Sequence, residues 1–195
     1  MTPRLVSFVV PVYNEQDNLP ELVRRSLAVG RALPYAFELV LVNDGSRDDS
    51  AKIIAATAER EPEVVGVLLN RNYGQHAAVL AGLAEARGDV VVTLDADLQN
   101  PPEEIPKLLA AIEEGCDVVS GLRRRRKDTL FRRVASRLMN QLMLRITRVN
   151  VGDYGCMLRA YRRDIVDAVL ACGDRSAYVP ALANSFAGRI REIEV

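Results

Sequence analysis

The chain lacks the patterns by which several classes of protein are recognised. Its three cysteines show no C-x-x-C spacing, so we expect neither a disulfide framework nor a cysteine zinc site. Cys116, Cys156 and Cys172 are predicted to be reduced core residues of a cytosolic protein. The glycine fingerprint G-x-G-x-x-G and the phosphate-binding loop G-x-x-x-x-G-K-[ST] are also absent. No signal peptide is recognisable, and no apolar run approaches the roughly 20 residues of a membrane span.

Charge is balanced overall but unevenly distributed along the chain. The formal net charge is zero, yet residues 122–148 contain nine arginines and one lysine against a single acid, Asp128. A length of 195 residues and a hydrophobic fraction of 49% suit one domain with a full core. We therefore expect a single domain, residues 1–195, in which one basic segment meets an anionic partner.

Short apolar runs alternate with helical patterns along the first half of the chain. Strands are expected at residues 6–10, 37–42, 64–69 and 90–95, with a helix after each. This alternation predicts an α/β fold with a mainly parallel sheet and right-handed crossovers. Asn18, with Glu21 three residues later, predicts a capping box at the start of the first helix.

The fourth of these strands ends at two carboxylates, Asp95 and Asp97, and the two prolines that follow prevent further sheet pairing. Residues spaced i and i+2 on an extended backbone point the same way, so both acids can face one cation. Carboxylate oxygens suit Mg²⁺ or Mn²⁺. The alternative is an acidic turn that caps a helix starting near Glu103.

Polar residues also follow the second and third strands. Asp44 could accept hydrogen bonds from ribose hydroxyls or a base N–H; the alternative is an Asx turn with Ser46 as helix cap. Arg71 could meet a phosphate. His76, the only histidine, is more typical of a polar helix start than of a catalytic base. Since carboxyl ends of parallel strands meet at one edge, these residues are expected to share one site with Asp95.

The basic segment contains a probable helix over residues 129–147. Its apolar residues recur at helical spacing, and arginines occupy the other faces. An apolar stripe flanked by arginines is typical of a helix lying in a membrane interface. An ordinary surface helix packed on the core is the alternative. A nucleic-acid patch is disfavoured because the stripe is so apolar.

Four ordered motifs resemble family 2 glycosyltransferases of the GT-A fold, in the branch that makes polyprenyl-phosphate sugars. They are PVYNE, NDGS, NRNYGQH and LDADLQNPP, beginning at residues 11, 43, 70 and 94. With residues 152–163 they are most similar to bacterial transferases that move 4-deoxy-4-formamido-L-arabinose to undecaprenyl phosphate. One departure is Asn43, where many members carry Asp, so Asp44 is the only acid there.

The resemblance implies a UDP-sugar donor, a polyprenyl-phosphate acceptor and Mg²⁺ or Mn²⁺. It also implies roles for individual residues. We expect the nucleotide at Pro11, Tyr13, Glu15, Asp44, Arg71 and Asp95; the metal at Asp95, Asp97 and Gln99; the acceptor phosphate at Arg123, Arg132 and Ser136; and catalytic roles for Asp97 and Asp153.

The reaction implied is a single inverting displacement that supplies lipid A modification at the cytoplasmic face of the bacterial inner membrane. Asp153 is expected to orient groups more than to take a proton, because a phosphate monoester is already largely anionic at neutral pH. The alternatives are transfer of glucose from UDP or mannose from GDP, and a nucleotide-binding domain without turnover. Retention of Asp95, Asp97 and Asp153 disfavours the last.

Relatives in this branch continue with a basic loop and membrane helices that this chain does not contain. The chain is therefore expected to be a catalytic-domain fragment or a short variant. It should bind UDP with metal but transfer sugar poorly. Nucleic acid is not an expected partner, and nothing in the sequence indicates an oligomeric state.

Overall fold

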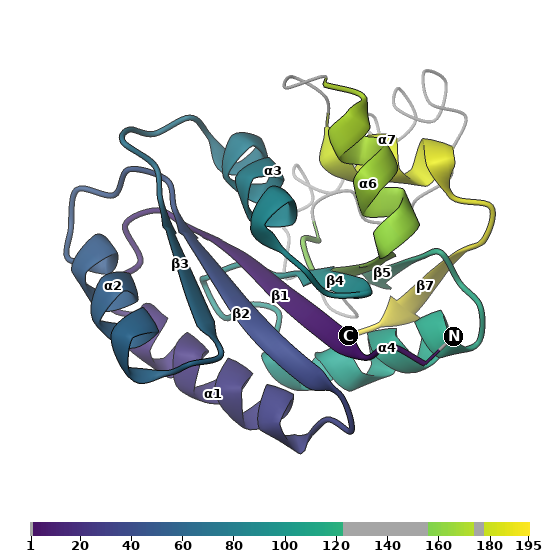
Figure 1. Ribbon diagram of the computed structural model, residues 1–195, viewed down its shortest axis with the longest axis horizontal. Coiled ribbons are helices and arrows are strands. Elements are labelled where there is room, and N and C mark those ends of the chain that lie inside the picture. The colour runs from purple at the N-terminus through teal and green to yellow at the C-terminus, as the bar shows by residue number, and fades with distance from the viewer. Residues whose placement is uncertain (1, 123–155, 174–177) are drawn as a thin grey trace, which may run out of the picture.

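A computed structural model describes residues 2–122, 156–173 and 178–195 of the chain. The helix expected at residues 129–147 lies outside these residues. The described part forms one central sheet between two layers of helices (Figure 1). Within it, no helix combines the length and the apolar composition needed to cross a membrane.

The described sheet has seven strands in the order β3-β2-β1-β4-β6-β5-β7. Neighbouring strands run parallel, except that β6 is antiparallel to both β4 and β5. The expected mainly parallel α/β sheet is therefore confirmed. The strands are β1 (Leu5–Val12), β2 (Ala36–Asn43), β3 (Val64–Leu68), β4 (Val90–Thr93), β5 (Val118–Leu122), β6 (Arg159–Arg162) and β7 (Ile190–Glu194).

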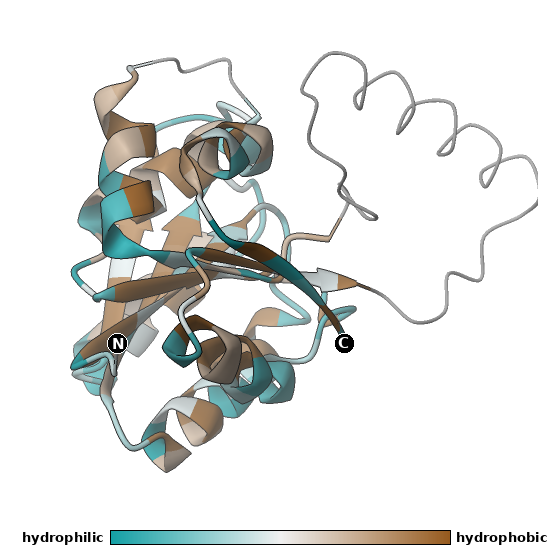
Figure 2. Ribbon diagram, turned by 90° about the vertical axis from the view of Figure 1, so that its right-hand side faces the viewer, coloured by the Kyte–Doolittle hydropathy of each residue, from teal (hydrophilic) through white to brown (hydrophobic). Residues whose placement is uncertain are grey.

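Helices cover both faces of the sheet, as Figure 2 shows, which explains the continuous apolar runs of the central strands. Alternate residues of β1 face opposite layers: Phe8 and Val10 pack with one, Val9 with the other. The first layer consists of α1 (Leu19–Ala32), α2 (Ser50–Arg60) and α4 (Ile105–Glu113). A 3₁₀ turn, η1 (Pro102–Glu104), directly precedes α4. The second layer consists of α3 (Gln75–Glu85), α6 (Arg163–Ala171) and α7 (Val179–Phe186).

The order of strands creates a switch point beside β1. From β1 the chain moves through β2 to β3 on one side, then returns to place β4 on the other side. In open α/β sheets, ligands bind outside the carboxyl ends of the strands at such a point. Here that position is the end of β1 and β4 near Val12 and Asp95.

Two local expectations are wrong, the capping box at α1 and the burial of Cys172. Asn18 precedes α1, but its side chain makes no capping bond and instead donates to the Glu15 carboxylate at 2.7 Å. Glu21 does not complete a capping box, because it pairs with the exposed Arg24. Cys172 is exposed, whereas Cys116 and Cys156 are buried as expected.

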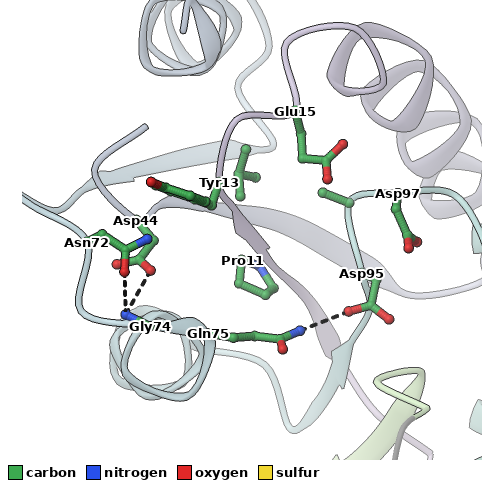
Figure 3. A pocket seen from close by; sticks show the side chains of 11 residues that line it. Pro11, Tyr13, Glu15, Asp44, Asn72, Gly74, Gln75, Asp95 and Asp97 are labelled. Atoms are coloured by element: carbon green, nitrogen blue, oxygen red, sulfur yellow. Dashed lines mark hydrogen bonds between the residues drawn. The ribbon is translucent and has the colours of Figure 1, made fainter. Parts of the chain in front are cut away.

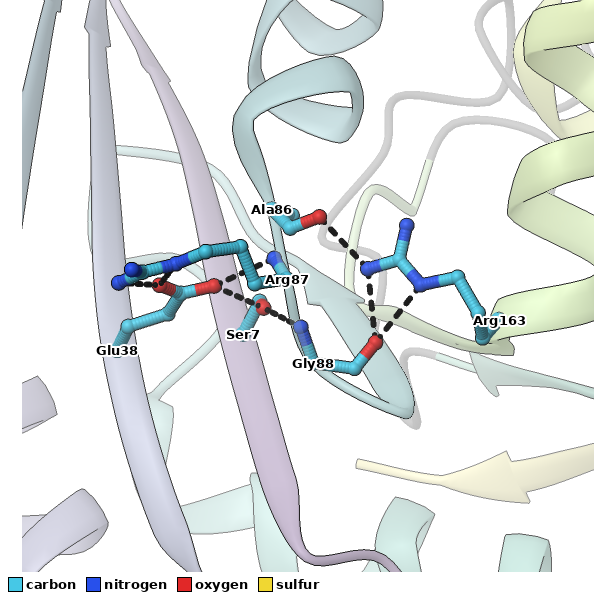
Figure 4. Close-up of polar contacts among 6 residues, drawn as sticks. All are labelled: Ser7, Glu38, Ala86, Arg87, Gly88 and Arg163. Carbon is cyan, nitrogen blue, oxygen red and sulfur yellow. Dashed lines mark hydrogen bonds and ion pairs between the residues drawn. The ribbon is translucent and has the colours of Figure 1, made fainter.

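The amino end of the sheet is held by a buried carboxylate, Glu38 of β2 (Figure 4). It accepts hydrogen bonds from the Ser7 hydroxyl at 2.6 Å and from the backbone and guanidinium of Arg87 at 2.6–2.9 Å. Burial works to raise the pKa of Glu38, but these hydrogen bonds outweigh it and hold the pKa below its ordinary value. On the other side of the loop, Arg163 donates to the carbonyls of Ala86 and Gly88.

Candidate active site

A pocket of about 300 Å³ opens at the carboxyl ends of β1, β2 and β4. Six of the residues expected to bind nucleotide or metal line it: Pro11, Tyr13, Glu15, Asp44, Asp95 and Asp97. In Figure 3, Pro11 lies in the middle, Asp44 on one side and the two aspartates on the other, with the Glu15 carboxylate turned inward. The expectation that residues after different strands lie at one edge of the sheet is therefore confirmed for Asp44, Asp95 and Asp97.

The loop after β1 presents Tyr13 and Glu15 because it is tied to the loop after β2. Asn14 adopts a left-handed backbone conformation, with φ of 55°. Its N–H donates to the Ser46 hydroxyl at 3.0 Å, and its side-chain oxygen accepts from the Arg47 N–H at 2.8 Å. These bonds hold the half-exposed Tyr13 ring at the mouth of the pocket, where it offers a face for stacking.

Asp44 is almost fully buried, with an exposed fraction of 2%. Its two carboxylate oxygens accept hydrogen bonds from the backbone N–H groups of Tyr73, at 2.7 Å, and Gly74, at 2.9 Å. Asp44 thus fastens the loop after β3 to the pocket wall. The alternative, an Asx turn with Ser46 as helix cap, is not what forms: the Ser46 N–H donates to the side chain of Asn43, three residues earlier, at 3.2 Å, and α2 begins only at Ser50.

Gly45 allows this close approach of the two loops. Its φ is +63°, and a Cβ built there would lie 2.3 Å from the backbone carbonyl carbon of Arg71. Only glycine adopts that conformation without strain while leaving this space open. The walls of the pocket beside Asp44 therefore depend on a glycine in the NDGS motif.

Asp95 and Asp97 lie at the opposite side of the pocket from Asp44, although β4 ends at Thr93 and not at Asp95 as expected. Asp95 accepts from the carboxamides of Gln75, at 3.0 Å, and Asn100, at 3.4 Å. Asp97 accepts from the Gln99 N–H at 3.0 Å. Neither η1 nor α4 has a side-chain cap, so these acids do not act as a helix cap.

The donor set fits a divalent cation that is shared with an anionic ligand. Among the described residues there is no group of three or more histidine, cysteine or acidic side chains that would enclose a metal. Mg²⁺ commonly binds through one or two carboxylates and completes its shell with substrate phosphates and water. Asp95 and Asp97, both facing one pocket, satisfy that requirement.

Other residues predicted for the site lie elsewhere. The Arg71 guanidinium stacks on the Tyr73 ring, 4.7 Å from its centroid, and Gln99 is exposed; neither lines the pocket. His76 meets the Tyr178 ring edge-on, with centroids 5.1 Å apart. The roles of Arg71 and Gln99 stay predictions. Four residues predicted for acceptor binding or catalysis lie outside the described residues: Arg123, Arg132, Ser136 and Asp153.

Sequence reasoning missed the pocket residues Asn72, Gly74 and Gln75, and the buried Asn100 beside Asp95. A usable signal was present for Gln75. It follows a glycine and begins a helix after a strand, which puts it at the same sheet edge as Asp95. Its side-chain direction was not readable from the sequence.

The sheet order, the switch point and the pocket define the GT-A architecture of glycosyltransferases. The family model described as "Glycosyl transferase family 2" matches residues 7–170, and the chain belongs to this family. A similar fold is seen in the glucosyl-3-phosphoglycerate synthase of Mycobacterium tuberculosis, solved with Mn²⁺, UDP and glucosyl-3-phosphoglycerate. It has a TM-score of 0.71 at 22% identity, covering 98% of this chain and 71% of that one.

Two curated relatives are much closer in sequence, and both are named undecaprenyl-phosphate 4-deoxy-4-formamido-L-arabinose transferase. The one from Pseudomonas fluorescens strain Pf-5 is 60% identical over 98% of this chain and 57% of its own length. The one from Klebsiella pneumoniae is 56% identical over 97% of this chain and 58% of its own length. The chain thus spans somewhat more than half the length of these relatives.

Proposed function

We propose that the protein is an inverting, metal-dependent glycosyltransferase that moves 4-deoxy-4-formamido-L-arabinose from UDP to undecaprenyl phosphate for lipid A modification. The observation that carries the proposal is the single pocket in which motif residues from three strand ends meet. The relatives named for this reaction, at 60% and 56% identity, support the choice of sugar and acceptor.

The described residues have separate parts in binding the donor. Tyr13 stacks on the base, and Asp44 keeps the loop around Asn72 closed against the nucleotide. Asp95 and Asp97 would hold Mg²⁺ or Mn²⁺, and the bound ion would supply neutralisation of the charge that builds on the departing UDP. An oxygen of the acceptor phosphate attacks the anomeric carbon from the face opposite UDP, so the configuration inverts.

The acceptor side of the proposal rests on the sequence. Arg123, Arg132 and Ser136 bind the lipid phosphate, because guanidinium groups match phosphate oxygens. Asp153 orients the reacting groups. We further propose that residues 1–195 belong to one GT-A catalytic domain and that its basic segment, residues 129–147, meets the membrane surface. The site of action is the cytoplasmic face of the bacterial inner membrane.

The test is a transfer assay on liposomes containing undecaprenyl phosphate, with a panel of UDP- and GDP-sugars. We expect a lipid product only with a UDP-sugar, only with Mg²⁺ or Mn²⁺, and best with the formamido-arabinose donor. A preference for UDP-glucose or GDP-mannose would overturn the assigned sugar. Donor binding measured by calorimetry on the same samples separates a domain that binds without transfer from one that does not bind.

A further inference from the structure

We infer that Gln75 is a positioning residue that holds the Asp95 carboxylate in the orientation needed to bind the divalent cation. The inference rests on the proposed function, because it concerns the metal-dependent binding of the donor. Gln75 is the first residue of α3, whereas Asp95 follows β4, so the contact joins two elements that line the pocket. Figure 3 shows the Gln75 side chain reaching below Pro11 to Asp95.

The hydrogen-bonding chemistry fixes the direction of this contact. An ionised carboxylate only accepts hydrogen bonds, so the Gln75 amide must present its NH₂ group to Asp95 Oδ1, at 3.0 Å. A carboxylate has about four acceptor sites, so an amide donor and a cation can be bound together. A neutral amide also restricts the carboxylate without adding a positive charge that would repel the metal.

Asn100 supports the same carboxylate from the other side. Its side chain is 1% exposed and donates to Asp95 Oδ2 at 3.4 Å. Its own oxygen accepts a weak hydrogen bond from the buried Cys156 thiol at 3.6 Å. The amide cannot flip without placing its oxygen against the carboxylate, so Asn100 is held in one orientation. Gln75 and Asn100 thus donate to different oxygens of Asp95, and together they set its plane.

Partners that orient metal-binding carboxylates have measurable effects although they do not touch the metal. Their removal typically lowers metal affinity by about 10–100-fold. Gln75 is the better target for mutation, because it is exposed and its replacement should not disturb folding. Asn100 is buried, so its loss would mix a folding defect with the effect on Asp95.

The experiment compares Gln75→Met, which keeps the length of the side chain but removes the donor, with wild type. The control is Gln16→Met, the same change at another exposed glutamine outside the pocket, where the lost contact is to the Asp49 N–H, at 3.0 Å, and not to Asp95. Two affinities are measured by calorimetry for each protein: that of Mn²⁺ in saturating UDP, and that of UDP in excess EDTA. We expect Gln75→Met to weaken Mn²⁺ binding about 10–100-fold and to leave metal-free UDP binding unchanged.

Two results would overturn the inference. One is Mn²⁺ affinity in Gln75→Met equal to that of wild type and Gln16→Met. The other is an equal loss of UDP affinity with and without metal, which would make Gln75 a direct nucleotide contact. Failure of the proposed function looks different, because wild type itself would then show no effect of Mn²⁺ on UDP binding.

Discussion

Glu38, within β2, and Asp95, just after β4, are acidic side chains at opposite ends of the central strands, and the structure gives them different partners. Glu38, at the amino end, is buried and pairs with the guanidinium of Arg87. Asp95, at the carboxyl end, accepts from the neutral carboxamides of Gln75 and Asn100 and faces the pocket. Among the described residues, Glu38 is thus paired with a cation within the fold, whereas the contacts to Asp95 come from amides that orient it toward the pocket.

This difference separates stability from binding. Three groups from different elements converge on Glu38 or on the loop behind it, namely Ser7, Arg87 and Arg163 (Figure 4). Their bonds fasten the loop between α3 and β4 to β1 and β2. The pocket end is fastened by backbone amides instead, as Asp44 shows with its bonds to Tyr73 and Gly74. We therefore expect mutations at the two ends to affect different measurements.

The largest effect is expected for Asp97→Asn, which keeps the side-chain volume but removes a charged metal ligand. Metal-dependent UDP affinity should fall by more than about 100-fold, beyond the loss caused by removing an orienting partner. Thermal stability without metal should hardly change, because Asp97 is at a half-exposed turn. Calorimetry with UDP in Mn²⁺ measures the effect, and an unchanged affinity would remove Asp97 from the site.

A smaller effect, on stability and not on nucleotide binding, is expected for Glu38→Gln. The neutral amide weakens the charge-assisted bonds from Ser7 and Arg87, so the free energy of unfolding should fall by about 2 kcal/mol. The side chain of Arg87 is 72% exposed, so its ion pair supplies only a minor share. Urea denaturation measures the loss, with Glu21→Gln as a control at an exposed pair. If the free energy of UDP binding fell by more than the free energy of unfolding, stability and binding would not be separate at this residue.

The dependence of stability on pH gives a third test. The folded pKa of Glu38 lies below the ordinary value of 4.5, so its stabilising effect is present above that value. The effect is lost as the pH falls through the folded pKa. The stability difference between wild type and Glu38→Gln should therefore be full at about pH 6 and shrink toward about pH 3. Taking the difference removes the contribution of other carboxylates with lowered pKa, such as Asp89. A difference that grows on acidification would contradict this.

The parallel part of the sheet was predictable from the sequence because β1, β2 and β4 are buried on both faces and read as apolar runs. The pocket residues on strand ends followed from the topology, as Asp44 and Asp95 illustrate. Side-chain partners did not follow, because hydrogen bonds such as Gln75 to Asp95 span 20 positions and depend on rotamers. The same limit applies at the start of α1, where the Asn18 side chain donates a hydrogen bond to the Glu15 carboxylate and does not cap the helix.

The smallest effect is expected for energetic coupling between the amino and carboxyl ends of the sheet. These ends are connected by β4, which has only four residues, Val90–Thr93. Arg163 holds Gly88 before this strand, and Gln75 holds Asp95 after it. Because β4 is paired on both sides, with β1 and β6, loosening one end should not slide it. In a double-mutant cycle of Arg163→Met and Gln75→Met, we expect a coupling energy below about 0.5 kcal/mol for Mn²⁺-dependent UDP binding. Coupling above about 1 kcal/mol would mean that β4 transmits displacement and that the amino end helps to place Asp95.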